Sequence, residues 1–201
     1  MSYFHEFCES LWGRSKIVQL VVGERLTFAR AFAYAHSNVR GSSSGGSSSG
    51  GGSSGAAAVI LANADIFFDG TLGGLASGRV SLEGRALALL RWDVGPDGAL
   101  HWSPRTDQQD AWVFESPLPA ALRNACAGEE CSFPLGLLQA DNRLAAILGD
   151  AGLRVSNPSL ALVSRHLQLD TGRRYTQQDT VPGKSRFVRI SDAFYEEDAD
   201  E

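Results

Sequence analysis

Apolar residues recur at every third or fourth position in four segments of the chain, the spacing that places them on one face of a helix. The clearest case is residues 26–37, where positions 28, 31, 32 and 35 are apolar and Thr27 has the side chain of an N-cap residue. This pattern predicts a helix that packs its apolar face on a sheet. The other predicted helices span residues 2–12, 119–127 and 139–150, and Gly152 follows the last one as a helix-ending glycine.

Shorter apolar runs that are bounded by Gly, Pro or polar residues predict strands. Residues 56–62 (AAAVILA) form a continuous apolar run, the pattern of a strand buried on both faces in a parallel sheet. Residues 95–98 (GPDG) predict a turn. The other predicted strands are residues 16–22, 85–92, 111–114, 153–156 and 160–164. Because strands alternate with helices, we expect a mixed α/β domain with helices on both faces of the sheet.

Two segments of the chain differ in composition from the rest, a Gly/Ser segment at 41–55 and an acidic segment at 196–201. Of the 22 glycines, seven lie in residues 41–55, which contain only Gly and Ser. Since these side chains are too small to bury, we expect a flexible insertion without a catalytic role. The net charge of -5 comes from five acids in residues 196–201, and the rest of the chain is neutral. We therefore predict one domain, residues 1–40 and 56–190, followed by a disordered acidic tail at 191–201. A neutral domain is not expected to bind nucleic acid.

The expected compartment follows from three further observations. No segment reaches the 18 or more apolar residues of a membrane helix, and residues 1–12 lack the charged-then-apolar order of a signal peptide. The three cysteines, Cys8, Cys126 and Cys131, are odd in number and form no CxxC pair, so we expect reduced thiols rather than a disulfide or a structural zinc site. The sequence therefore predicts a soluble, intracellular, cytoplasmic chain with no membrane span.

Polar residues directly after a predicted strand are the first candidates for chemistry, since ligands of α/β sheets bind beyond strand ends. Asn63 and Asp65 follow the strand at 56–62, and alternation along an extended chain would point both side chains to the same side. An amide and a carboxylate in this arrangement suit a hard divalent cation. The competing interpretation is that both residues simply form the turn that ends the strand.

Seven motifs together resemble a family of glycosyltransferase-like proteins, which are similar to nucleotide-sugar transferases of the GT-A fold, and the match covers residues 16–175. Their ordered occurrence is more specific than any one of them. The motifs are RLTFARAFAYA (25–35), NADIFFD (63–69), LLRW (89–92), DQQDAWVF (107–114), FPLGLLQADNRLAAIL (133–148), VSNPSLALVSRHL (155–167) and GRRY (172–175).

This resemblance implies a GT-A-like fold, with a mixed, mostly parallel sheet and helices on both faces. GT-A domains normally open on a strand whose following loop holds the nucleotide base. The sequence given opens on a predicted helix instead. The expected sheet therefore lacks its first strand.

The resemblance also implies a metal site. Asn63, Ala64 and Asp65 correspond to the DxD element that holds a divalent metal, Mn²⁺ or Mg²⁺, and the pyrophosphate of the donor. Asp65 is then the expected metal ligand, and Asn63 in the first position lowers the charge of the ligand set. His166 resembles the late histidine that completes metal coordination in many such transferases, with a purely structural histidine as the competing interpretation.

The remaining roles are assigned by the same resemblance. Asp110 is the expected catalytic base that removes the proton from the attacking hydroxyl, although a carboxylate here could also cap a strand or helix end. Arg173 and Arg174 are expected to pair with the diphosphate, with solvated surface charge as the alternative. The residues expected on the acceptor side are Asp141, Asn142 and Trp112, of which Asp141 could instead be an N-cap and Trp112 a core residue.

Two functions follow from the resemblance. The first is a metal-dependent glycosyltransferase that moves a sugar from a nucleotide-diphosphate donor to a carbohydrate or other hydroxyl acceptor. The second is a truncated or degenerate relative that keeps the fold as a binding or interaction module without turnover. The two differ in whether Asp65 and Asp110 face a common substrate.

Overall fold

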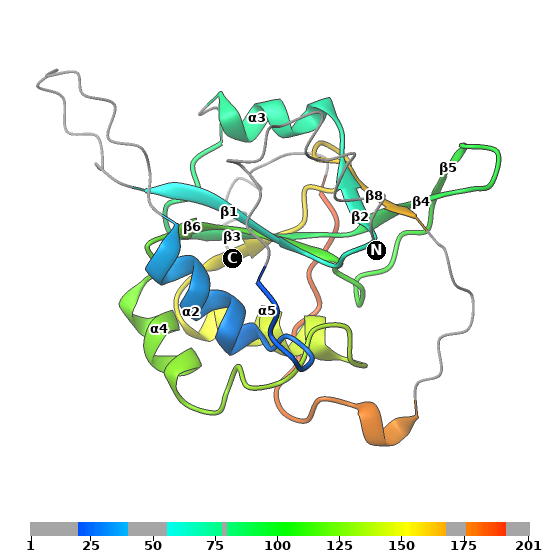
Figure 1. Ribbon diagram of the computed structural model, residues 1–201. Helices are drawn as coiled ribbons and strands as arrows, with labels where there is room; N and C mark the ends of the chain where they lie inside the picture. The colour runs from blue at the N-terminus through cyan, green and yellow to red at the C-terminus, as the bar shows by residue number, and fades with distance from the viewer. Residues whose placement is uncertain (1–19, 40–55, 78–79, 168–175, 192–201) are drawn as a thin grey trace, which may run out of the picture.

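The computed structural model describes residues 20–39, 56–77, 80–167 and 176–191 (Figure 1). The predicted helix at 2–12, the Gly/Ser insertion, Arg173, Arg174 and the acidic tail beyond residue 191 lie outside these residues. So does most of the predicted strand at 16–22, whose last three residues are described and form no strand.

Helix α2 (Phe28–Asn38) confirms the helix predicted over residues 26–37, and Thr27 is its N-cap, as expected. Thr27 is extended, and its side chain accepts a hydrogen bond from the backbone N–H of Arg30 at 3.3 Å. The N–H groups of the first two helical residues donate to the backbone carbonyls of Phe133 and Cys131. The N–H groups that a helix start leaves without intrahelical acceptors are therefore satisfied by a side chain and a neighbouring loop.

The first sheet contains four strands in the order β1–β6–β3–β7. β6 is antiparallel to both of its neighbours, and β7 is parallel to β3. The strands are β1 (Ala57–Ala62), β3 (Arg85–Leu89), β6 (Ala111–Ser116) and β7 (Arg154–Ser156).

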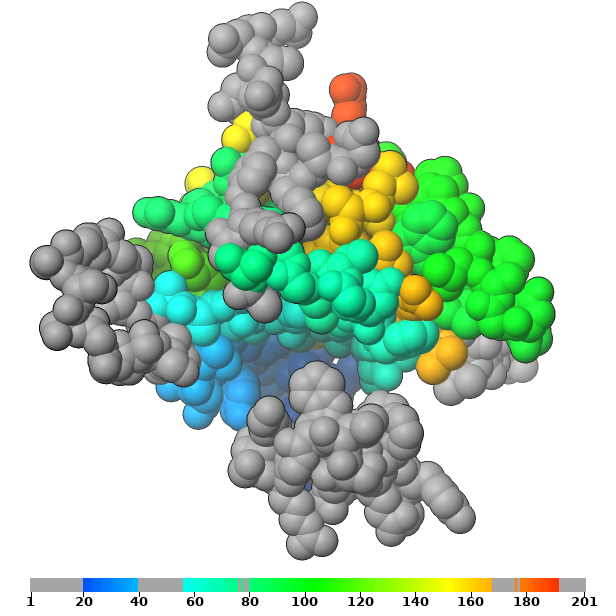
Figure 2. Space-filling view, turned by 90° about the horizontal axis from the view of Figure 1, so that it is seen from above, coloured from blue at the N-terminus to red at the C-terminus, as the bar shows by residue number. Residues whose placement is uncertain are grey.

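The second sheet also has four strands, in the order β2–β8–β4–β5. β8 is antiparallel to β2 and parallel to β4, and β4 forms an antiparallel hairpin with β5 around the predicted turn, where Gly98 has a φ of 80°. Figure 2 shows β8 between the α3 segment and this hairpin. The strands are β2 (Ile66–Phe68), β4 (Arg91–Val94), β5 (Leu100–Trp102) and β8 (Ser164–Leu167).

The prediction of a mostly parallel sheet is wrong. Of the described strand pairings, four are antiparallel and two are parallel. A short turn joins β4 to β5, and such a connection favours antiparallel strands, whereas parallel neighbours need long crossovers. β1 is also half-exposed at an edge of its sheet among the described strands, so its expected burial on both faces is wrong. An apolar run does not reveal how many neighbours a strand has.

The strand predicted at 85–92 is divided at Leu90 into β3 and β4, which belong to different sheets. The N–H of Leu90 donates to the hydroxyl of Ser159 at 2.7 Å, and its carbonyl accepts from the hydroxyl of Ser164 at 2.9 Å. Two serine side chains thus satisfy the backbone at the break. Ser159 directly precedes the strand predicted at 160–164 and Ser164 is its last residue, whereas the observed strand begins only at Ser164.

Helices cover both faces of the first sheet, as predicted (Figure 1). On one face α2, α4 (Ala120–Ala127) and α5 (Ala140–Asp150) enclose a helix-side core that includes Trp112 and Phe114. On the other face, β2, a 3₁₀ helix (Gly70–Leu72) and α3 (Gly73–Ala76) cover a sheet-side core around Leu87, Leu89 and Val113. Gly152, with a φ of 86°, follows α5 as expected. A second 3₁₀ helix spans Gln177–Asp179.

The cysteines differ from the prediction. Cys126 in α4 and Cys131 form a disulfide, because the chain reverses directly after α4 and brings their Cα atoms to 4.8 Å. The cytoplasmic expectation therefore loses the support that it drew from reduced thiols. Within the described ranges, every helix is too short or too polar to cross a membrane.

Candidate functional site

Six polar side chains meet where the two sheets join. Two come from the turn between β1 and β2, two from β4, one from the residue before β6 and one from β8. Hydrogen bonds connect residues that are up to 101 positions apart in the sequence. We name this group the seam cluster, and its members are Asn63, Asp65, Arg91, Asp93, Asp110 and His166.

Asp110, the predicted base, is held from two sides. Arg91 donates from Nη1 to Oδ1 at 3.1 Å and to Oδ2 at 3.3 Å. Asn63 donates from Nδ2 to Oδ1 at 3.0 Å. Backbone bonds fix the same contact, since the N–H of Asp110 donates to Leu89 and its carbonyl accepts from Asn63. The side chains of Arg91 and Asp110 are only 14% and 7% exposed, so this is a largely desolvated ion pair.

His166 lies between two carboxylates. Its Nδ1 is 2.7 Å from Oδ1 of Asp93, and its Nε2 is 3.1 Å from Oδ2 of Asp65. Strand register accounts for the first contact, because Asp93 and His166 are directly opposite each other in the β4–β8 pair. The imidazole is 3% exposed, whereas Asp65 is 38% exposed. Asp65 therefore opens this part of the seam cluster to solvent.

Asn63 and Asp65 reach the cluster by a turn, not by the expected strand alternation. The N–H of Ile66 donates to the carbonyl of Asn63 at 3.1 Å, and the chain doubles back into β2. The two side chains then meet different partners: Asn63 contacts Asp110, and Asp65 contacts His166. The four predicted residues are nevertheless brought into one hydrogen-bonded group.

Arg91 and Asp93 link the two halves of the cluster and were not among the predicted site residues. Arg91 donates from Nε to Oδ1 of Asp93 at 3.0 Å while its Nη1 holds Asp110. Their sequence signal was weak but present. Two opposite charges occupy alternate positions just after an apolar strand, which places them on one face.

Asp65 and His166 are the side chains of the seam cluster that could hold a divalent cation. Oδ1 of Asp65 is buried and has no hydrogen-bond partner in the structure, and Oδ2 faces a ring nitrogen. The cluster also sets three carboxylates against one guanidinium. Among the described residues, no group of three or more His, Cys, Asp or Glu side chains is arranged to hold a metal ion. A site with two protein ligands is still consistent with Mg²⁺-like ions, which take much of their coordination from phosphates and water.

The residues expected on the acceptor side lie away from the seam cluster, Trp112 on the helix-facing side of β6 and Asp141 and Asn142 in α5. Trp112 is buried in the helix-side core and its ring is not available for stacking on a sugar. Asn142 is buried in α5, where its backbone carbonyl accepts from Arg186. Asp141 is in the first turn of α5 and is not its N-cap, since the helix begins after Gln139, which has a φ of 63°.

Asp69 forms a separate ion pair beside the seam cluster. Arg165 donates to its Oδ2 from Nε at 3.2 Å and from Nη2 at 2.8 Å, and Thr71 donates to Oδ1 from its backbone and its hydroxyl. Burial opposes ionisation of this carboxyl, but the hydrogen bonds from Thr71 and Arg165 outweigh it and hold the pKa of Asp69 below its ordinary value. Because Asp69 is the N-cap of the 3₁₀ helix at Gly70–Leu72, we interpret its ion pair with Arg165 as a structural contact.

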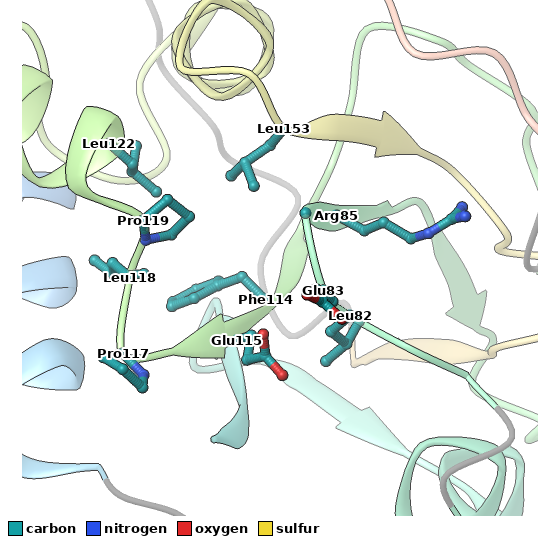
Figure 3. Close-up of a pocket in the computed structure, with 11 residues that line it drawn as sticks. Leu82, Glu83, Arg85, Phe114, Glu115, Pro117, Leu118, Pro119, Leu122 and Leu153 are labelled. Carbon is teal, nitrogen blue, oxygen red and sulfur yellow. The ribbon is translucent and has the colours of Figure 1, made fainter. Parts of the chain in front are cut away.

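A pocket of about 190 Å³ lies at the other end of the first sheet (Figure 3). It is next to the start of β3 and the end of β6, whereas Arg91 follows β3 and Asp110 precedes β6. Its lining is mostly apolar, and Figure 3 shows the guanidinium of Arg85 directed away from Phe114 and Leu122. None of the predicted site residues lines it.

No protein-family model matches the chain, and neither a curated protein nor a solved structure does. The function of the seam cluster therefore has to be judged from its own side chains. They provide a carboxylate–imidazole pair, Asp65 and His166, that is partly exposed to solvent, and a buried carboxylate, Asp110, that is bound by Arg91.

Proposed function

We propose that this protein is a GT-A-like glycosyltransferase that binds Mn²⁺ or Mg²⁺ together with a nucleotide-diphosphate sugar at Asp65 and His166, and transfers the sugar to a hydroxyl acceptor. Asn63 and Asp110, which the sequence resemblance also assigned to this function, lie in the same hydrogen-bonded cluster. Arg173 and Arg174 remain proposed partners of the diphosphate.

The observation that carries the proposal is the pair formed by Asp65 and His166. One oxygen of Asp65 is buried without a partner, and the other faces Nε2 of His166 at 3.1 Å. A carboxylate oxygen and an imidazole lone pair repel each other unless a proton or a metal ion lies between them. A divalent cation would satisfy both groups and would offset the excess of carboxylates in the cluster.

The chemical roles follow from position. The cation, when bound, would stabilise the negative charge that develops on the leaving diphosphate. Asp65 and His166 would hold it, with Asp65 reaching solvent where a donor can approach. Asp110 would accept the proton of the acceptor hydroxyl, and the amide of Asn63 would orient its Oδ1. An acceptor must compete with Arg91 for this carboxylate.

Calorimetric titration with Mn²⁺ and a panel of UDP- and GDP-sugars tests the proposal, followed by an assay for release of the nucleoside diphosphate. The decisive variant is Asp65→Asn, and Asp107→Asn is its control, since the two side chains are 38% and 40% exposed. We expect binding and turnover by the wild type, a loss of at least about tenfold in Mn²⁺ affinity for Asp65→Asn, and no loss for Asp107→Asn. Absence of binding by the wild type, or equal binding by Asp65→Asn, overturns the proposal.

The hydrogen bonds from Arg91 to both carboxylate oxygens of Asp110 favour a second function. Both oxygens of Asp110 are engaged by the guanidinium, an arrangement that suits a structural carboxylate better than a catalytic base. The protein would then bind the donor without transferring the sugar. This function predicts Mn²⁺-dependent nucleotide-sugar binding that requires Asp65, with no nucleoside diphosphate released in the presence of any hydroxyl acceptor tested.

A further inference from the structure

We propose that Asp93 is the positioning residue of His166: it holds the proton on Nδ1 of the imidazole, so that Nε2 is the nitrogen presented to Asp65. The consequence for cation binding rests on the proposed function. The assignment of the ring nitrogens does not, since it follows from the contacts of Asp93 alone.

Arg91 establishes that Oδ1 of Asp93 acts as an acceptor. Its Nε donates to that oxygen at 3.0 Å, and an arginine nitrogen has no lone pair with which to accept. The same Oδ1 lies 2.7 Å from Nδ1 of His166. A carboxylate oxygen that already accepts one hydrogen bond makes a second contact this short with a donor, so Nδ1 carries a hydrogen.

The backbone leaves the ring little freedom to avoid this arrangement. Asp93 and His166 are paired residues of two parallel strands, and the imidazole is almost entirely buried. Once Nδ1 is bonded to Asp93, Nε2 must face Asp65, because the two nitrogens lie on opposite sides of the ring. Histidine ligands of metal ions commonly donate their second nitrogen to a carboxylate in this way, which fixes the tautomer and makes the ligating nitrogen more basic.

Asp69, which directly follows β2, provides a matched control. It is paired with Arg165 much as Asp93 is paired with Arg91, and the two carboxylates are 24% and 28% exposed. The hydrogen bonds of Asp69 go to Thr71 and Arg165. Removing either carboxylate therefore removes a comparable ion pair, but only Asp93 contacts the imidazole.

The experiment compares wild type, Asp93→Ala, Asp93→Asn and Asp69→Ala by two measurements. Long-range ¹H–¹⁵N correlation spectra of the metal-free proteins report which imidazole nitrogen carries hydrogen, and a His166→Gln spectrum assigns the signal among the four histidines. Electron paramagnetic resonance then gives the affinity for Mn²⁺ alone. Far-UV circular dichroism verifies folding, and Asp93→Asn, which keeps an acceptor oxygen at this position, serves if Asp93→Ala does not fold.

We expect Nδ1 of His166 to be protonated in the wild type and in Asp69→Ala. In Asp93→Ala the hydrogen should move to Nε2, where Asp65 accepts it, and the Mn²⁺ affinity should fall about 10- to 100-fold. Asp93→Asn should lie between wild type and Asp93→Ala. Wild-type nitrogen shifts in both Asp93 variants overturn the inference, even where Mn²⁺ binds and the proposed function stands. Altered shifts in a protein whose wild type binds no Mn²⁺ support the positioning role and overturn the proposed function.

Discussion

Replacing Arg91 with methionine tests whether the seam cluster is held together by its buried ion pair. Methionine keeps most of the length of the side chain and removes the charge. The substitution takes away the donors to both oxygens of Asp110 and to Oδ1 of Asp93. Since Asp110 is only 7% exposed, water does little to replace the lost guanidinium.

The expected cost follows from that burial. Breaking a buried ion pair by removing one partner costs about 3–5 kcal/mol, because an uncompensated charge remains. For a chain of this length, each kcal/mol lowers the melting temperature by about 2–4 °C. We therefore expect Arg91→Met to lower the melting temperature by about 6–20 °C. The double variant Arg91→Met/Asp110→Leu removes both charges and should recover about 1–3 kcal/mol of this loss.

Urea denaturation followed by circular dichroism measures these free energies of unfolding. The control is Arg105→Met, which removes an arginine–aspartate contact with Asp107 of similar length whose side chains are 53% and 40% exposed. An exposed pair of this kind contributes at most about 1 kcal/mol. If Arg91→Met costs no more than Arg105→Met, the Arg91–Asp110 pair is not a buried structural element. Asp110 would then not be the structural carboxylate that the second function requires.

Three further outcomes are expected. Thr27→Ala should lower the free energy of unfolding by about 1 kcal/mol in urea denaturation, because the hydroxyl that caps α2 is lost, and Thr27→Ser should restore most of it. Reduction of the Cys126–Cys131 disulfide should cost about 2 kcal/mol, the loop-closure value for a separation of five residues, and an unchanged melting temperature under dithiothreitol would contradict this. The pKa of Asp69 is lowered below 3.8 in the folded state, so its ionised form stabilises the fold above that pH, and this contribution is lost as the pH falls through the lowered value. Acid titrations followed by circular dichroism should therefore show a smaller loss of stability below about pH 4 for Asp69→Asn than for the wild type.

Helices α2, α4 and α5 were predictable from the sequence because their signals are local, whereas the short α3 was not predicted. The apolar spacing of α2, its cap at Thr27 and the glycine after α5 depend on residues within one or two turns of each other. The four strands of the first sheet were predicted, but β2 and β5 were missed, and the mostly parallel pairing expected of the strands was wrong. An apolar run such as residues 57–62 records that side chains are partly buried, and it carries no information about the direction or number of neighbouring strands.

Four of the six residues of the seam cluster were among the predicted site residues, and two were not. Asn63 and Asp65 follow a predicted strand, and Asp110 and His166 were assigned through the ordered set of motifs. The two residues that join them could not be predicted, because their role depends on the break at Leu90 and on the register that sets Asp93 opposite His166. The disulfide was missed on similar grounds, since it depends on the direction in which the chain leaves α4.

The geometry also gives a physical reason for an asparagine at position 63, where the proposed DxD element would have an aspartate. Asn63 donates its amide N–H to Oδ1 of Asp110 at 3.0 Å. An aspartate at this position has no hydrogen to donate and would place two carboxylates in contact within a largely buried cluster whose one arginine is shared by Asp93 and Asp110. The amide at position 63 is therefore tied to the carboxylate at position 110. In the proposed metal site, the lower charge at position 63 would follow from this contact, and Asp65, which is 38% exposed, is the carboxylate that opens toward solvent.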